Sequence, residues 1–254
     1  MSGAADTARL ALACLDLTSL NDADTPADIE ALCRRARSRH GDVAAVCVWP
    51  RFVAQARAAL PASIRVAAVA DFPEGALDPG RALRDTAEIV DAGGDEVDLV
   101  LPWRALAAEQ VRESHALVAA VRRATPGRTL KLILESGELA QPDLIGAAAR
   151  LGLDEGVDFL KTSTGKTAHS ATPEAARVML DAIRTHGRGA TVGFKASGGI
   201  RRVADAAVYI DLVRSALGEA ALGRARLRFG ASGLLGDIEA VLGGAAPAPA
   251  GTGY

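Results

Sequence analysis

The sequence predicts a single (β/α)8 TIM barrel, and three observations lead to that fold class. The chain has 254 residues, of which 49% are hydrophobic and 24% charged, enough material for one large ordered core. Short apolar runs typical of β-strands recur eight times, about 20 to 35 residues apart. Longer segments with helical spacing separate them, so we expect parallel strands joined by helical crossovers.

The expected strands are short runs rich in Val, Leu, Ile and Ala. In chain order they are Leu10–Leu15, Val43–Val48, Ile64–Ala70, Glu96–Leu101, Leu130–Leu134, Asp158–Lys161, Val192–Lys195 and Arg228–Ala231. A doubly wound open sheet is the alternative, but it has fewer strands and a dinucleotide-type glycine motif. Gly230, Gly233 and Gly236 are spaced by three, which does not match that motif.

The expected helices are Ala- and Arg-rich segments between the strands. The clearest are Pro26–Ser38, Asp78–Asp91, Glu109–Arg123, Pro142–Leu151, Pro173–Thr185 and Val203–Leu217. Three of them open with a capping residue and a first-turn proline: Thr25-Pro26, Asp78-Pro79 and Thr172-Pro173. No linker divides the chain, so we expect one barrel domain over residues 1–242. The Gly-, Ala- and Pro-rich end, residues 243–254, is expected to be a flexible tail.

Composition excludes several classes of function. The formal net charge is −2, which gives no support to a nucleic-acid partner. The one basic cluster, Arg34, Arg35, Arg37 and Arg39, is interpreted as a solvated helix face. No apolar run approaches the roughly 18 residues of a membrane span, and no signal peptide is recognisable. The scattered histidines and three cysteines have no metal-ligand spacing, so we expect no metal and reduced thiols in a cytoplasmic protein.

The lysines are few and placed unevenly. Only four of the 29 basic residues are lysines: Lys131, Lys161, Lys166 and Lys195. A lysine amine can lose its proton and attack a carbonyl, whereas a guanidinium stays charged. A coding bias toward arginine would explain the ratio. It would not explain why three of the four lysines lie beside predicted strands.

In a barrel, functional residues lie at the C-terminal ends of the strands. Asp16 is expected at the end of the first strand, Lys161 at the end of the sixth and Lys195 at the end of the seventh. Side chains alternate along a strand, so the apolar neighbours of Asp98 face the helices and Asp98 turns into the barrel. A carboxylate and two ammonium groups in one cavity would shift each other's pKa values.

Lys161 is the candidate nucleophile. A lysine amine is almost fully protonated at neutral pH, but burial or a second cation such as Lys195 lowers its pKa. The free amine could form an imine with an aldehyde or ketone and so stabilise a carbanion, without a cofactor. Asp98 could move protons directly or through water. The alternative is that these three residues form a buried ion-pair network that only holds the barrel.

Two glycine-containing loops suggest a phosphate site. Ser197-Gly198-Gly199 follows the seventh strand and Ser232-Gly233 follows the eighth, where barrels often bind phosphate through backbone N–H groups. Ordinary turn glycines are the alternative. The stretch from Leu160, L-K-T-S-T-G-K-T, ends like a P-loop, but that motif needs a glycine where Leu160 stands.

With these residues in view, the chain resembles the metal-independent, Schiff-base deoxyribose-phosphate aldolases from about Leu10 to Leu242. Six blocks carry the resemblance and fall in order at the predicted strands: L-D-L-T-S-L-N from Leu15, V-C-V-W-P-R-F from Val46, D-E-V-D-L-V from Asp95, L-K-T-S-T-G-K-T from Leu160, G-F-K-A-S-G-G from Gly193 and F-G-A-S from Phe229. The resemblance implies a TIM barrel and a carbon–carbon lyase. The reaction would be reversible cleavage of 2-deoxy-D-ribose 5-phosphate to acetaldehyde and D-glyceraldehyde 3-phosphate, as part of carbohydrate degradation.

The resemblance also implies roles for single residues. Lys161 stands at the Schiff-base lysine, Lys195 at the lysine that perturbs it, Asp98 at the proton-transfer aspartate and Asp16 at the other active-site acid. The remaining positions are on the substrate side: Thr164 and Lys166 line the substrate and phosphate, Gly198, Gly199 and Ser232 supply phosphate-binding backbone, and Cys47 lies near the pocket as a thiol open to inactivation. Tyr254 matches a terminal tyrosine that some members fold over the site as a proton relay; a disordered tail is the alternative.

Two departures from the family pattern concern the phosphate side. Ala196-Ser197 stands where a familiar member has Pro-Ala, and Gly233 stands where it has a second serine. Loss of that hydroxyl could weaken phosphate binding or leave it to the backbone. Two alternative functions remain: another Schiff-base aldolase or transaldolase on the same barrel, and a non-catalytic barrel that binds a sugar phosphate. We also expect small-molecule substrates and a homodimer. We expect no nucleic-acid partner and no membrane association.

Overall fold

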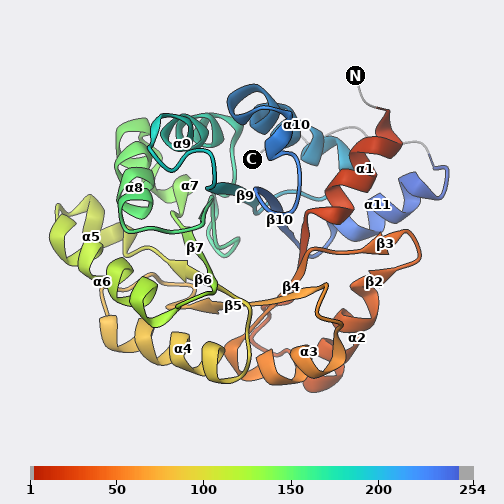
Figure 1. Ribbon diagram of the computed structural model, residues 1–254, viewed down its shortest axis with the longest axis horizontal. Helices are drawn as coiled ribbons and strands as arrows, with labels where there is room; N and C mark the ends of the chain where they lie inside the picture. Colours follow the sequence, from red (N-terminus) through yellow and green to blue (C-terminus); the bar gives the residue numbers. More distant parts are fainter. Residues whose placement is uncertain (1–2, 246–254) are drawn as a thin grey trace.

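The computed structural model describes residues 3–245, and eight parallel strands form its centre. They are β1 (Leu15–Thr18), β4 (Ala45–Val48), β5 (Arg65–Ala70), β6 (Glu96–Val100), β7 (Thr129–Ile133), β8 (Phe159–Lys161), β9 (Gly193–Ser197) and β10 (Leu227–Ala231). Each pairs with the next along the chain, and β10 pairs with β1 to close the barrel (Figure 1). The expected (β/α)8 barrel is confirmed.

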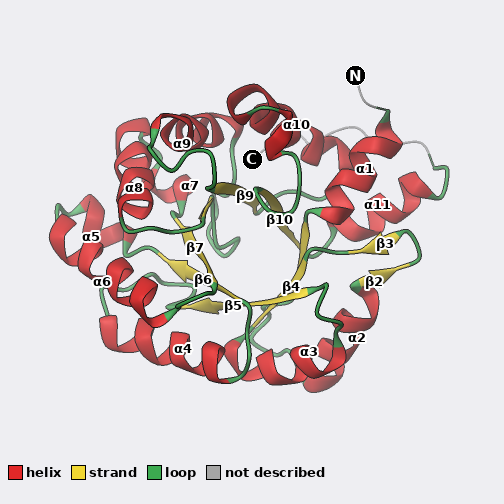
Figure 2. Cartoon of the chain, viewed as in Figure 1, coloured by secondary structure: helices red, strands yellow, loops and turns green. Residues whose placement is uncertain are grey.

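Helices surround the barrel on all sides (Figure 2). They are α1 (Ala4–Ala13), α2 (Pro26–Arg35), α3 (Val53–Ala59), α4 (Pro79–Asp91), α5 (Trp103–Ala107), α6 (Val111–Ala124), α7 (Ser136–Leu139), α8 (Pro142–Asp154), α9 (Pro173–Thr185), α10 (Val203–Leu217) and α11 (Leu234–Leu242). Short 3-10 turns cover Pro50–Phe52 and Glu219–Ala221. The predicted caps are confirmed, because the side chains of Thr25, Asp78 and Thr172 each accept a first-turn backbone N–H.

Two local predictions are wrong. The run expected as the first strand, Leu10–Leu15, is mostly the end of α1, and β1 starts only at Leu15. Ala8, Ala11 and Leu12 are spaced for one helix face, and they are buried where α1 contacts α10 and α11. The first expected helix, Pro26–Ser38, ends at Arg35, before a small antiparallel pair, β2 (Arg37–Ser38) and β3 (Gly41–Asp42). The four arginines of the basic cluster are exposed, but only two of them lie on the helix.

The molecule separates its apolar and its charged buried residues. Outward-facing strand residues such as Val97 and Leu99 pack in the main apolar core with the surrounding helices. The interior of the barrel holds buried ionised side chains, and Asp98 is among them, as the alternation along β6 predicts. A smaller apolar cluster, which contains Cys47, Val69 and Phe72, is built from the ends of β4 and β5 and their neighbours. The polar interior therefore opens at the strand ends, where the candidate site lies.

The ends of the chain limit two predictions. Helix α11 ends at Leu242, and residues 246–254 lie outside the described residues, as does Tyr254 with its expected relay role. The expected flexible tail therefore stays a prediction. Over the described residues, the helices include none with the length and apolarity that a membrane crossing requires.

Candidate active site

Seven ionisable side chains fill the interior of the barrel, and six strands contribute them. They are Asp16 on β1, Glu96 and Asp98 on β6, Lys131 on β7, Lys161 on β8, Lys195 on β9 and Arg228 on β10. Each is at most 5% exposed. Burial on this scale is tolerable only because every charge faces a partner of opposite sign. The interior is therefore one connected ion-pair network.

Asp98 joins the two lysines that were predicted to be catalytic, Lys161 and Lys195. Its Oδ2 is 2.9 Å from the Nζ of Lys161 and 2.9 Å from the Nζ of Lys195. Lys195 also donates to Oδ2 of Asp16, so the second predicted acid belongs to the same cluster. Parallel register explains the grouping, because Lys161 pairs directly with Lys195 across β8 and β9. Gly230 on β10 makes room for the Lys195 side chain, since a Cβ there would lie 3.0 Å from its Cε.

The network shifts the pKa values of its lysines in opposite directions. Burial lowers the pKa of Lys161, the positive charge of Lys195 lowers it further, and Asp98 only partly opposes them. Burial acts on Lys195 in the same sense, but Asp16 and Asp98 outweigh it and raise its pKa. Lys161 is thus the amine that gives up its proton most readily, as a nucleophile requires.

The acids of the cluster are held ionised. Burial alone would raise the pKa of Asp98, but Lys131, Lys161 and Lys195 outweigh it and hold the pKa well below its usual range. The pKa of Asp16 is also lowered, because Lys195 and Arg228 outweigh its burial. Asp98 is therefore a carboxylate that can accept a proton only transiently and pass it to a neighbour.

Three residues of the network, Glu96, Lys131 and Arg228, were not among the predicted site residues. Lys131 Nζ lies 2.6 Å from both Glu96 Oε2 and Asp98 Oδ1, and Arg228 bridges Asp16 and Glu96 at 2.7 and 2.8 Å. A signal was present for Glu96, since the alternation that turns Asp98 inward also turns the residue two positions earlier. Lys131 was one of the four scarce lysines. Nothing in the sequence distinguished Arg228 among the 25 arginines.

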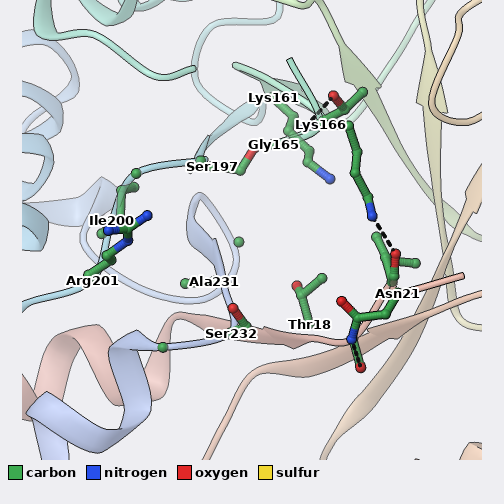
Figure 3. Close-up of a pocket in the computed structure, with 17 residues that line it drawn as sticks. Thr18, Asn21, Lys161, Gly165, Lys166, Ser197, Ile200, Arg201, Ala231 and Ser232 are labelled. Atoms are coloured by element: carbon green, nitrogen blue, oxygen red, sulfur yellow. Dashed lines mark hydrogen bonds between the residues drawn. The ribbon is translucent and has the colours of Figure 1, made fainter. Parts of the chain in front are cut away.

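A cavity of about 590 Å³ opens over Lys161 (Figure 3). Lys161 is the network lysine that lines it, whereas Lys131 and Lys195 lie beneath the surface. Seven predicted site residues line this cavity: Lys161, Thr164, Lys166, Gly198, Gly199, Ser232 and Gly233. Ser197 of the predicted phosphate loop lines it too, and so do Thr18 and Arg201, which were not among the predicted site residues.

The loops after β9 and β10 form the side of the cavity suited to an anion. Gly198 and Gly199 have φ of 84° and 80°, a conformation that side chains rarely adopt, and a Cβ on Gly198 would collide with Ser170. Ser232 and Gly233 precede α11, whose first turn has no side-chain cap among the described residues. The N-terminus of a helix attracts negative charge, and the Arg201 side chain lies across from it (Figure 3).

Thr164 and Lys166 lie on a loop that is fastened to its neighbours. The hydroxyl of Thr164 donates to Glu135 Oε2 at 2.6 Å, and its backbone N–H donates to the same carboxyl group. Lys166 Nζ donates to the Leu20 carbonyl oxygen at 2.7 Å, which joins the loop after β8 to the loop after β1 (Figure 3). Glu135 is fully buried with φ of 54°, and sequence reasoning missed it.

Cys47 was predicted to lie near the pocket as a thiol open to inactivation, but it does not line the cavity. Its side chain is fully buried in the small apolar cluster. Burial raises the pKa of its thiol, and Asp98 raises it further. Because the thiolate is the reactive form, this environment disfavours attack on an electrophile.

Comparison with known proteins gives one consistent result. A model of the DeoC/LacD family aldolases matches residues 10–235. A deoxyribose-phosphate aldolase of Agrobacterium fabrum (strain C58) is 45% identical over 252 residues, which cover 98% of this chain and 96% of that protein. The apo crystal structure of a candidate deoxyribose-phosphate aldolase from Toxoplasma gondii ME49 superposes with a TM-score of 0.85 at 27% identity, covering 94% of this chain and 97% of that one. A candidate from Coccidioides immitis gives 0.80 at 28%, covering 92% and 86%. The chain therefore belongs to the DeoC/LacD family of aldolases.

Proposed function

We propose that the protein is a class I deoxyribose-phosphate aldolase, which cleaves 2-deoxy-D-ribose 5-phosphate reversibly to acetaldehyde and D-glyceraldehyde 3-phosphate. The observation that carries the proposal is the amine of Lys161, which has a lowered pKa and lines a 590 Å³ cavity beside an anion-binding rim. The curated relative at 45% identity has this activity as its name. A carbon–carbon lyase of this kind needs an electron sink, and an imine supplies it.

The proposed reaction begins with Lys161. Its free amine attacks the C1 aldehyde carbon of the open-chain sugar, and the carbinolamine takes up a proton and loses water to give a protonated imine. The C3 hydroxyl then loses a proton as the C2–C3 bond breaks, and the electron pair of that bond forms an enamine. D-glyceraldehyde 3-phosphate leaves. The enamine takes up a proton at C2, and water releases acetaldehyde and the amine.

We assign the proton transfers to Asp98 and its partners. Asp98 lies 2.9 Å from the amine of Lys161 and can take the C3 hydroxyl proton directly or through one water. The proton removed from the C3 hydroxyl balances the proton added at C2. The proton taken up to form the imine is released when water hydrolyses it, so the site needs a relay and no net acid. Lys195 contacts the same oxygen of Asp98 as Lys161 does and is paired with Asp16, so Lys195 and Asp16 would return that proton.

The phosphate group fits the rim formed by Gly198, Gly199, Ser232 and Gly233. Two consecutive glycines and an uncapped helix start offer backbone N–H groups to its oxygens. Gly233 supplies no hydroxyl, so backbone donors and the charge of Arg201 would carry the binding. Lys166 contributes charge from the opposite loop.

The test is to trap the imine. The protein is incubated with 2-deoxyribose 5-phosphate, reduced with borohydride and mapped by peptide mass. We expect the adduct on Lys161. An adduct on Lys195 would reverse the two lysine roles, and an adduct formed only with acetaldehyde or unphosphorylated deoxyribose would remove the phosphate preference. No adduct with any of them would favour a binding protein with a structural ion-pair network.

The three cysteines bear on the compartment in which the enzyme would work. Cys14, Cys33 and Cys47 are free and buried, which suits a reducing compartment such as the cytoplasm.

We also propose a homodimer. Leu83 on α4 and Val111 on α6 are exposed large apolar side chains on two helices that contact each other, and a subunit contact would cover them. Light scattering on the eluting protein measures the mass directly, and a monomer mass would contradict the dimer.

A further inference from the structure

The charged interior of the barrel is not balanced. Among the described residues it holds three carboxylates, Asp16, Glu96 and Asp98, and four cationic groups, Lys131, Lys161, Lys195 and Arg228. With every group ionised, the network carries one surplus positive charge. A surplus charge in a buried network is costly, so the group that can shed it at least cost will do so.

Contacts decide which cation is the surplus one. Arg228, Lys131 and Lys195 each lie within ion-pair distance of at least two carboxylates. Lys161 has one ion-pair partner in the network, Asp98, which it shares with Lys131 and Lys195. Lys161 is thus the least compensated of the four cations.

Arg228 is the cation that cannot relieve the surplus. A guanidinium stays protonated at any pH that the fold survives. Arg228 is also held in place by several contacts. Its Nη1 donates to Asp16 and its Nη2 donates to Glu96. Its Nε donates to the Arg224 carbonyl oxygen at 2.5 Å, and its Cζ lies 5.6 Å from the centre of the Phe159 ring. It does not line the cavity, so it would not touch a substrate there.

We propose that Arg228 is a positioning residue for the reaction: its permanent charge, paired with Asp16 and Glu96, makes Lys161 the surplus cation and so keeps the Lys161 amine free. The inference rests on the proposed role of Lys161 as nucleophile and adds the source of its reactivity. Lys195 is the immediate cationic neighbour, but Lys195 is fully matched by Asp16 and Asp98. Without Arg228, three lysines would face three carboxylates, and Lys161 would keep its proton.

Other groups that face Lys161 do not alter the comparison. Cys47 on β4 and Glu135 after β7 interact electrostatically with it. Glu135 makes its hydrogen bonds to Thr164 and Thr167, outside the interior network. Both residues remain in every variant below, so their effect cancels when variants are compared.

The test changes the charge count in both directions. Arg228→Met removes the surplus, and we expect the midpoint for deprotonation of Lys161 to rise by on the order of one pH unit. Glu96→Gln increases the surplus, so the midpoint should fall. The double variant Arg228→Met/Glu96→Gln has three lysines and two carboxylates, which restores one surplus charge. Its midpoint should return toward the wild-type value.

The measurement is trace acetylation by acetic anhydride across pH, with the Lys161 peptide quantified by mass spectrometry. Acetylation needs an accessible free amine but no turnover. It therefore reads the amine even if the substrate assignment fails, whereas that failure would appear as an absent imine adduct in the wild type. The acid limb of kcat/KM should move with the labelling midpoint in each variant.

A merely structural role for Arg228 gives a different pattern. It predicts three destabilised proteins with an unchanged midpoint, or a double variant no closer to wild type than Arg228→Met; either result overturns the proposal. Replacing both partners of a buried pair by neutral groups of similar size is often tolerated. If Arg228→Met alone fails to fold, Glu96→Gln and the double variant still decide, because a midpoint that does not fall in Glu96→Gln also overturns it.

Discussion

Lys161 combines a positive charge beside Asp98 with an amine that can attack a carbonyl, and a substitution can separate these two properties. Lys161→Arg keeps a cation beside Asp98 but removes the amine that can form an imine. We expect cleavage of deoxyribose 5-phosphate to fall by at least about a thousandfold while the fold persists. Turnover, a thermal melt and borohydride trapping measure the three quantities. Activity within tenfold of wild type would show that another group is the nucleophile.

At the same scale, the sequence was informative where a residue obeys a simple periodic rule. Strand alternation placed Asp98 inside the barrel, and the same rule applied once more would have placed Glu96 there. Arg228 could not be distinguished, because its importance depends on which carboxylates meet it across the barrel. Those partners lie 132 and 212 residues away along the chain. Only the closed sheet brings them together.

Among the elements, the loop after β8 depends on one buried carboxyl group. Glu135 accepts hydrogen bonds from the Thr164 hydroxyl, the Thr164 N–H and the Thr167 hydroxyl. Glu135→Gln turns one acceptor oxygen into a donor facing these donors, so the loop that carries Lys166 should loosen. We expect KM for deoxyribose 5-phosphate to rise about tenfold, the worth of one hydrogen bond, with kcat little changed.

The control for this prediction is internal. Unphosphorylated deoxyribose does not use the phosphate side, so its KM should stay within about twofold. Gly137→Ala should reproduce the effect by a different route, because a Cβ there would lie 2.3 Å from the His169 carbonyl oxygen on the same loop. Glu138→Gln on the same short helix is the matched variant without the contact. Equal rises in KM for both sugars would indicate general damage to the site.

Element boundaries show why sequence patterns succeed at some places and fail at others. The starts of the helices after Thr25, Asp78 and Thr172 were predicted correctly, since a cap and a first-turn proline act within one helical turn. The prediction for Leu10–Leu15 failed because six apolar residues in a row fit a buried strand and a buried helix end equally well. Contact with α10 and α11 settles it, and that contact is long-range.

Asp71 is a buried carboxyl group that does not belong to the ion-pair network of the barrel interior. Asp71 follows β5 and is fully buried, and no hydrogen bond to either side-chain oxygen occurs among the described residues. The Nε of Arg81, 3.7 Å away, is its ion-pair partner. Burial raises the pKa of Asp71 to about 7, which Arg81 only partly opposes. The folded protein therefore holds this proton more tightly than the unfolded chain does.

The sign of the effect on stability follows from that difference. For a carboxyl group with a raised pKa in the folded state, the contribution to stability is complete below the unfolded pKa near 4 and is lost as the pH rises through about 7. Asp71→Asn cannot lose a proton, and asparagine tolerates the positive φ of 52° at this position. Relative to wild type, the variant should therefore gain on the order of 2 kcal/mol of unfolding free energy between pH 5 and pH 8. Urea unfolding at both pH values measures the gain, and an equal difference between the two proteins at pH 5 and pH 8 would show that Asp71 does not titrate in this range.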